Sequence, residues 1–228
     1  MNSQLLSLLQ LSDPALPIGG YAHSSGLETY VQKELVYDVE SAKNFITQML
    51  TQNLQYTDAA FVSLAYDAAV QNDFEKIIQL DEECNAVKLP TEVRTASQKL
   101  GMRLIKIFET ITNNLITKKY SEAINANECN GHYCIAFALY GNTLQINKKD
   151  LLAGFYYNAA AGFVTNCVKL VPLGQKDGQE ILFGLQSLIN ELVESTMHPN
   201  TDLIGLCCTG FDIRCMQHEQ LYSRLYMS

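Results

Sequence analysis

Residues 181–193 read ILFGLQSLINELV and carry the clearest structural signal in the chain. Their large apolar side chains recur every three or four residues, which places them on one face of an α-helix. The members of this stripe are Ile181, Leu182, Leu185, Leu188, Ile189, Leu192 and Val193. Similar stripes run through residues 45–54 and 100–115, whereas strand-like alternation is hard to find. The sequence therefore predicts an all-α protein.

Helix-breaking residues divide the chain into about eight to ten predicted helices. The breaks fall at Asp38, residues 71–73, Pro90, residues 125–131, residues 141–147, residues 172–178 and Pro199. No break is long or polar enough to be an interdomain linker. The chain has 228 residues, 47% of them hydrophobic, which suffices for a real core. We expect a single-domain multi-helix bundle over residues 1–228.

One segment near the N-terminus differs from a simple helix. Residues 8–28 read LLQLSDPALPIGGYAHSSGLE. Pro14 and Pro17 remove backbone donors and favour extended geometry before them, while Gly19 and Gly20 allow backbone angles that are closed to other residues. We expect a specifically shaped loop here.

A second distinctive segment, residues 153–162, reads AGFYYNAAAG. Small residues between aromatic ones let helix backbones approach closely, so this segment is predicted to be a central helix. Two such helices could instead meet across a subunit interface, and composition does not decide between the two roles.

The charge balance and the cysteine content restrict the class of protein. The chain has 16 basic and 24 acidic residues and a formal charge of −8, which repels nucleic acid and anionic lipid. Its seven cysteines are an odd number, and its N-terminal residues do not resemble a secretion signal. Its apolar stretches are interrupted before the roughly 20 residues of a membrane span. We expect a reduced, cytoplasmic protein that binds neither nucleic acid nor membrane.

Five residues near the C-terminus offer imidazole or thiolate groups, which several transition metals accept as ligands. They are His198, Cys207, Cys208, Cys215 and His218. Neither HExxH nor CxxC occurs, so the spacing of a structural zinc site is missing. Buried thiols are the alternative, because a free cysteine usually behaves as a small hydrophobic residue. We expect no tightly bound cofactor and identify these five residues as a candidate transient metal site.

No sequence motif requires catalysis. The chain lacks both the GxxxxGK[ST] phosphate-binding loop and the GxSxG nucleophile elbow. His218 and Glu219 are adjacent, so they face different directions on a helix and make a poor catalytic pair. A solvated or capping role is the default expectation for His218. The sequence therefore favours a protein that is not an enzyme.

The C-terminal tail, residues 212–228, reads DIRCMQHEQLYSRLYMS and mixes apolar with polar groups. Two of the four arginines of the chain, Arg214 and Arg224, lie within it. An amphipathic end segment of this kind docks either on its own core or on another protein.

Three blocks of sequence together resemble the UreF family of urease accessory proteins. They are PALPIGGYAHSSGLE at residues 14–28, VKLVPLGQKDGQ at residues 168–179 and the tail at residues 212–228. A weaker fourth block consists of Arg94, Ser97 and Gly101. The chain departs from the pattern of the family at Asp13, His23, Lys169 and Cys215, and the likeness still covers essentially the whole chain.

The resemblance implies an all-α homodimer that binds the accessory protein UreD, also called UreH, and recruits the GTPase UreG. Such an adaptor serves the insertion of nickel into apo-urease, so the resemblance implies that the candidate metal site near the C-terminus is a transient nickel site. The resemblance places the tail at the UreD/UreH contact, and we regard Lys169 as the candidate contact with UreG. The tail residues expected to bind the partner are Arg214, His218, Glu219, Leu221, Tyr222 and Arg224.

Two alternative functions remain open. The first is a cysteine-dependent hydrolase that pairs one of the thiols with a histidine such as His132, which requires a thiolate in a cleft. The second is a GTPase-activating role in which Arg94 or Arg224 enters the site of UreG as an arginine finger.

Overall fold

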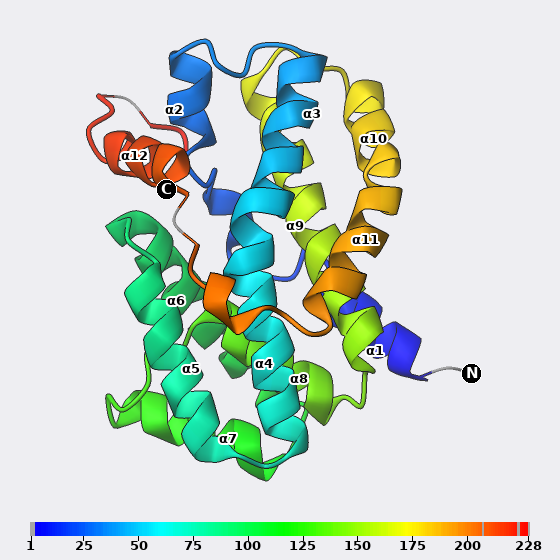
Figure 1. The fold of residues 1–228 in the computed structure, drawn as a ribbon, viewed down its shortest axis with the longest axis vertical. Coiled ribbons are helices and arrows are strands. Elements are labelled where there is room, and N and C mark those ends of the chain that lie inside the picture. Colours follow the sequence, from blue (N-terminus) through cyan, green and yellow to red (C-terminus); the bar gives the residue numbers. More distant parts are fainter. Residues whose placement is uncertain (1–2, 207, 223, 228) are drawn as a thin grey trace.

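The computed structural model describes residues 3–206, 208–222 and 224–227. All regular structure in these ranges is helical, which confirms the predicted all-α class (Figure 1). The α-helices are α1 (Ser3–Leu11), α2 (Leu27–Gln32), α3 (Val39–Gln48), α4 (Asp58–Val70), α5 (Phe74–Val87), α6 (Thr91–Phe108), α7 (Leu115–Asn125), α8 (Tyr133–Thr143), α9 (Lys148–Leu170), α10 (Gln175–Gly184), α11 (Gln186–Thr196) and α12 (Thr209–His218). Shorter turns are η1 (Gly20–Ala22), η2 (Met49–Asn53), η3 (Leu54–Tyr56) and η4 (Thr201–Leu203).

Two helices organise the packing. Helix α9 contacts α10, α11, α3 and α4, and Figure 1 shows it running behind α3. It contains the segment of small residues, and Phe155, Tyr156, Ala160 and Ala161 of that segment are buried, as expected for a central helix. Helix α8 packs against α4 and α6, and all of its residues 134–141 are buried. One connected cluster of buried apolar side chains extends from α1 to α12.

The stripe at residues 181–193 is buried as predicted, except for the half-buried Leu188, but it belongs to two helices. Helix α10 ends at Gly184, which has a weak helix propensity. The Leu185 amide then shares its hydrogen between the carbonyl oxygens of Ile181 and Leu182, at 3.1 and 3.3 Å. This tightened turn separates α10 from α11, and such divisions explain why the helices slightly outnumber the prediction.

The stripe predicted at residues 100–115 is wrong beyond Phe108. Helix α6 ends there, and Ile111 and Leu115 are 58% and 70% exposed. Asn114 begins the next helix, because its side chain accepts a hydrogen bond from the Ile116 amide at 2.9 Å. A good N-cap thus overrides the apolar periodicity.

The N-terminal loop has the specific shape that its prolines and glycines predict. Gly19 has a φ of 88°, and a Cβ atom there would lie 2.1 Å from Nη1 of Arg103. The same Nη1 donates a hydrogen bond to the Ile18 carbonyl at 2.9 Å. Arg103 therefore holds the loop against α6, and this contact requires a glycine.

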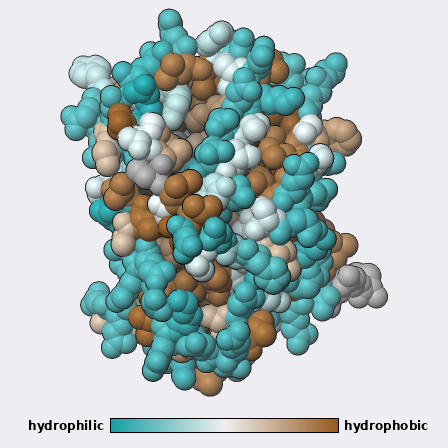
Figure 2. Space-filling view, in the orientation of Figure 1, coloured by the Kyte–Doolittle hydropathy of each residue, from teal (hydrophilic) through white to brown (hydrophobic). Residues whose placement is uncertain are grey.

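Hydrophobic and hydrophilic side chains are mixed on the face of the molecule seen in Figure 2, without one continuous hydrophobic band. Within the described ranges, no helix combines the length and apolar character that crossing a bilayer requires.

Candidate functional site

Helix α12 brings the C-terminal tail against the N-terminal block of the chain. It packs on α2 and α6, with Cys215 and His218 buried in the contact. Gly26 has a φ of 76°, and a Cβ atom there would lie 2.8 Å from Sγ of Cys215. Only a glycine therefore lets the segment before α2 approach α12 this closely.

His218 lies between two carboxylates. Its Nδ1 is 2.7 Å from Oε2 of Glu92, and its Nε2 is 2.9 Å from Oε2 of Glu28. Both ring nitrogens therefore have a carboxylate oxygen as hydrogen-bond partner. The side chain is fully buried. The expectation of a solvated or capping His218 is therefore wrong, because neighbouring elements supply partners that adjacent sequence does not.

The chain beyond α12 returns to the same two carboxylates. Glu28 accepts hydrogen bonds from the amides of Leu225 and Tyr226, at 2.7 and 3.1 Å. Arg224 pairs through Nη1 with Oε1 of Glu92 at 2.5 Å. We call Glu28, Glu92, His218 and Arg224 the tail clamp. It docks the tail on its own core and joins the first and third sequence blocks.

The clamp leaves apolar side chains of the tail exposed. Tyr222 is fully exposed, Leu225 is 72% exposed, and Met227 is also exposed. The Met227 amide donates to the Ala22 carbonyl at 2.8 Å, so this end of the tail lies beside the N-terminal loop. We call Tyr222, Leu225 and Met227 the tail surface.

The remaining predicted partner-binding residues lie in different environments. Arg214 is half-buried and donates to Oε1 of Gln217 at 2.8 Å, a local contact along α12. Glu219 is exposed and Leu221 is half-buried. Lys169 is exposed in the last turn of α9, a helix that contributes no residue to the tail clamp.

The described members of the candidate nickel group do not form a cluster of three ligands, although Cys208 lies close enough to affect the pKa of Cys215. His198 is exposed beyond the end of α11, Cys208 is half-buried before α12, and Cys215 is buried on α12. His218 is occupied by its two carboxylates, and Cys207 lies outside the described residues. Across the part of the chain that the structure describes, no three or more His, Cys, Asp or Glu residues are arranged to hold a metal.

A cavity of about 260 Å³ lies beneath the N-terminal loop. Its polar lining includes His23, Asn53, Asp58, Lys88, Asn158 and Asn166, and apolar side chains of α6 and α9 complete it. Asn166 donates to the His23 carbonyl at 2.9 Å and so ties the loop to α9. Burial, followed by the nearby Arg103 and Lys99 charges, lowers the pKa of His23.

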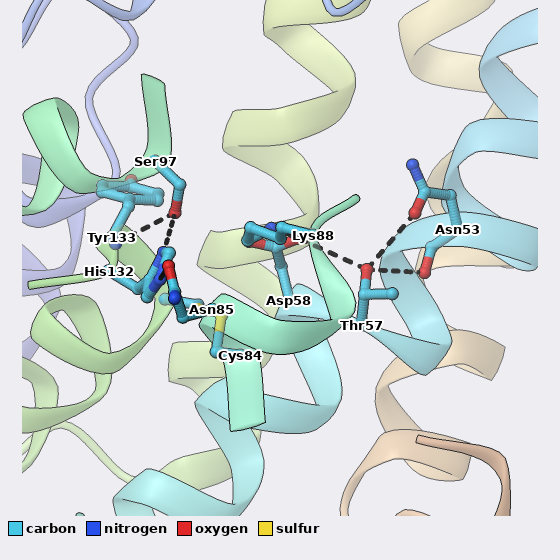
Figure 3. Close-up of polar contacts among 10 residues, drawn as sticks. Asn53, Thr57, Asp58, Cys84, Asn85, Lys88, Ser97, His132 and Tyr133 are labelled. Carbon is cyan, nitrogen blue, oxygen red and sulfur yellow. Dashed lines mark hydrogen bonds and ion pairs between the residues drawn. The ribbon is translucent and has the colours of Figure 1, made fainter. Parts of the chain in front are cut away.

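A buried ion pair forms one wall of this cavity (Figure 3). Nζ of Lys88 is 2.6 Å from Oδ2 of Asp58. Burial alone would raise the pKa of Asp58, but the charge and hydrogen bond of Lys88, with smaller contributions from His132 and Thr57, together hold this pKa below its usual range. Burial alone would lower the pKa of Lys88, but the Asp58 carboxylate, with Cys84 and Cys134, raises it above its usual value. Both groups are therefore charged at neutral pH.

The fourth sequence block fixes α6 to the elements around this wall. Oγ of Ser97 lies 3.1 Å from Nδ1 of His132. Arg94 donates a hydrogen bond to the Lys88 carbonyl at 2.9 Å. A Cβ atom on Gly101 would lie 2.0 Å from the Gly131 carbonyl oxygen, so α6 approaches the start of α8 closely. These three residues have structural roles that the sequence pattern alone did not reveal.

The geometry does not favour the hydrolase alternative. The ring nitrogens of His132 face Ser97 and Asn85 (Figure 3), and its side chain is fully buried. The nearby thiols of Cys84 and Cys134 are also fully buried, and neither lines the cavity. A substrate of ordinary size therefore does not reach them in this conformation.

Comparison with known proteins identifies the family of the chain. The family model described as UreF matches residues 36–186. A protein of Actinobacillus pleuropneumoniae serotype 5b, named urease accessory protein UreF, is 47% identical over 225 residues, which is 99% of each chain. Proteins of the same name from Haemophilus influenzae (strain ATCC 51907) and Bacillus sp. (strain TB-90) are 43% and 33% identical, over 99% of this chain and 96% and 100% of theirs. The chain therefore belongs to the UreF family.

Proposed function

We propose that this protein is a urease accessory protein that acts as an adaptor. It binds UreD/UreH, recruits the GTPase UreG, and so supports insertion of nickel into apo-urease. The observation that carries the proposal is the match over 99% of the chain to proteins named urease accessory protein UreF. The tail surface supports it, because exposed apolar side chains on a docked segment suit a protein contact.

The proposal divides the predicted tail residues into two groups. His218 and Arg224 hold the tail through Glu28 and Glu92 and act on the partner indirectly. Tyr222 and Leu225 are free to be covered by UreD/UreH, as large apolar side chains at the centre of an interface often contribute most to affinity. Because the tail is already docked on the core, it loses less conformational entropy when the complex forms than a free tail would lose.

Two further parts of the proposal concern assembly and metal. The protein acts as a homodimer, so that each complex presents two adaptor subunits to UreG. It holds no tightly bound cofactor, and the nickel contact predicted at His198, Cys207, Cys208, Cys215 and His218 is transient. A GTPase-activating role for Arg94 or Arg224 is less supported, because both side chains are engaged within the chain.

A pull-down with UreD/UreH and UreG tests the adaptor role, with light scattering to give the mass of the complex. The test variant is Tyr222→Ala/Leu225→Ala, and the control is Phe183→Ala, a 73% exposed aromatic on α10. We expect the test variant to lose UreD/UreH and the control to keep it. Removal of residues 214–228 is a poorer test, because Cys215, His218 and Tyr226 are buried.

The same measurement can contradict the proposal. If the folded Tyr222→Ala/Leu225→Ala protein binds UreD/UreH as tightly as the parent chain, the tail surface is not the contact. If the parent chain itself retains neither partner, the adaptor role is wrong. A strictly monomeric mass at high concentration would remove the homodimer.

A further inference from the structure

Two buried cysteines from distant parts of the sequence face one another in the core. Cys84 lies on α5 and Cys134 lies at the start of α8, 50 positions later. Their Sγ atoms are 3.5 Å apart, and both side chains are fully buried. A disulfide requires a separation of about 2.05 Å, so a small side-chain movement would bring the two sulfur atoms into bonding distance.

The surroundings of this pair differ from those of an inert buried thiol. Lys88 lies one helical turn after Cys84, and His132 lies nearby on the segment before α8 (Figure 3). Burial would raise the pKa of Cys84, but the hydrogen bond with Cys134, the Lys88 charge and His132 together lower it. Burial and the neighbouring Cys84 raise the pKa of Cys134. One thiolate beside one thiol is the arrangement of an attacking and a resolving cysteine.

The pair also lies beside the cavity. Lys88 lines the cavity and is the fourth residue after Cys84, while Tyr133, another lining residue, directly precedes Cys134. The wall of the cavity therefore adjoins the pair through Lys88, whose charge acts on Cys84. A small oxidant that enters the cavity reaches this wall.

We propose that Cys84 and Cys134 form a reversible disulfide when the protein meets hydrogen peroxide. The Cys84 thiolate attacks one peroxide oxygen, so that an S–O bond forms and the O–O bond breaks. The released hydroxide takes up the proton that Cys84 gave to the solvent when it ionised, and becomes water. The Cys134 sulfur then attacks the Cys84 sulfenic acid, forming the S–S bond, and the hydroxyl leaves with the Cys134 proton as water. Overall, two thiols are oxidised and one peroxide is reduced to two waters.

The test uses the reduced full-length protein, treated with hydrogen peroxide at neutral pH and quenched with acid. Remaining thiols are alkylated in urea, and the unreduced digest is analysed by mass spectrometry. We expect a linked peptide pair containing Cys84 and Cys134, which dithiothreitol removes. Cys167 is the internal control, because it is fully buried and its pKa is raised to about 12 by burial. Cys167 should stay a thiol during the peroxide treatment and therefore be found alkylated.

Two serine variants identify the order of attack. In Cys134→Ser, Cys84 should accumulate a sulfenic acid that dimedone traps, whereas in Cys84→Ser, Cys134 should remain a thiol. The linkage map of the parent chain decides the proposal even if a variant fails to fold. The proposal is overturned if Cys84 and Cys134 stay reduced, or if Cys167 is oxidised at the same rate, since that would indicate general exposure of the core.

Discussion

Nε2 of His218 forms a hydrogen bond with Oε2 of Glu28 at 2.9 Å, although the two residues are 190 positions apart. The contact joins the C-terminal helix α12 to the start of α2. Glu28 is buried and also accepts the amides of Leu225 and Tyr226, so a single carboxylate holds both α12 and the segment beyond it. The position of the tail surface thus depends on a residue near the N-terminus.

Glu28→Ala should destabilise the fold strongly. The substitution leaves the His218 imidazole and the amides of Leu225 and Tyr226 without their buried acceptor. We expect a loss of roughly 3 kcal/mol in the free energy of unfolding, because several buried polar groups lose their partner and each costs about 1–3 kcal/mol when left unsatisfied. Urea unfolding measures it. Glu219→Ala, an exposed carboxylate next to His218, should change stability by less than about 0.5 kcal/mol. Equal effects would show that Glu28 does not hold the tail.

Gly101→Ala should also be destabilising, because its Cβ would lie 2.0 Å from the Gly131 carbonyl oxygen. Backbone must move to relieve this contact, and overpacking of this kind typically costs about 1–3 kcal/mol. The matched control is Gly162→Ala within α9, where a Cβ atom meets nothing within 4 Å. Thermal unfolding should show a lower midpoint for Gly101→Ala and an unchanged or higher one for Gly162→Ala, because alanine favours the helix. An unchanged midpoint for Gly101→Ala would contradict the close approach of α6 and α8.

Asp58→Asn should reduce stability in a pH-dependent way. At pH 7 the variant leaves Lys88 charged and buried without its partner, at a cost of roughly 3 kcal/mol. The pKa of Asp58 is lowered in the folded state, so its contribution is complete above the pKa of the unfolded residue, about 3.9, and disappears as pH falls through the folded value. The parent and variant proteins should therefore converge in acid.

Urea unfolding of both proteins from neutral to acid pH checks this difference. Glu191→Gln, an exposed carboxylate on α11, provides a control whose effect should be small at every pH. If the difference in unfolding free energy between Asp58→Asn and the parent chain is constant with pH, the lost stability comes from packing and not from charge.

Helix type and core positions were accessible from sequence, because a side-chain period near 3.6 residues is a local property. Residues 181–193 are mostly buried as expected, and the helix break at Asp38 is correct, since its side chain accepts the Ser41 amide at 2.8 Å. The stripe through residues 100–115 failed beyond Phe108 because the Asn114 cap is a stronger local signal than the apolar pattern. Helix ends depend on such single hydrogen bonds.

The candidate site was much less predictable. Glu28 lies inside a quoted sequence block, yet nothing local indicates that its partner is His218. The pairing of Asp58 with Lys88 is equally non-local, as 30 residues and a helix reversal separate them. Adjacency along a helix did exclude Glu219 as a partner of His218, but it gave no indication that Glu28 and Glu92 take that place. Charged residues that meet only in the folded structure have no characteristic separation along a single sequence.

Lys169→Glu should weaken recruitment of UreG while leaving the fold intact. Lys169 is exposed at the end of α9, whereas Val171, which follows it closely, is buried, so a change of charge here alters the surface and not the core. A pull-down with preformed UreD/UreH complex measures the effect. Lys118→Glu, an exposed lysine on α7, is the charge-matched control. Loss of UreD/UreH with UreG retained would assign the Lys169 surface to the other partner.

Arg224→Ala should weaken UreD/UreH binding more than either Lys169→Ala or Arg214→Ala. Arg224 pairs the tail with Glu92, whose other carboxylate oxygen is hydrogen-bonded to Nδ1 of His218. Removal of the Arg224 side chain should therefore loosen the segment that carries Tyr222. Arg214 supplies the same charge but donates along α12 to Oε1 of Gln217 and not to the tail clamp, so its variant tests position against charge. We expect Arg224→Ala to lower affinity about tenfold, corresponding to about 1.4 kcal/mol of lost tail ordering. Titration calorimetry measures it, and similar losses for both arginine variants would mean that net charge, and not the tail clamp, supports the complex.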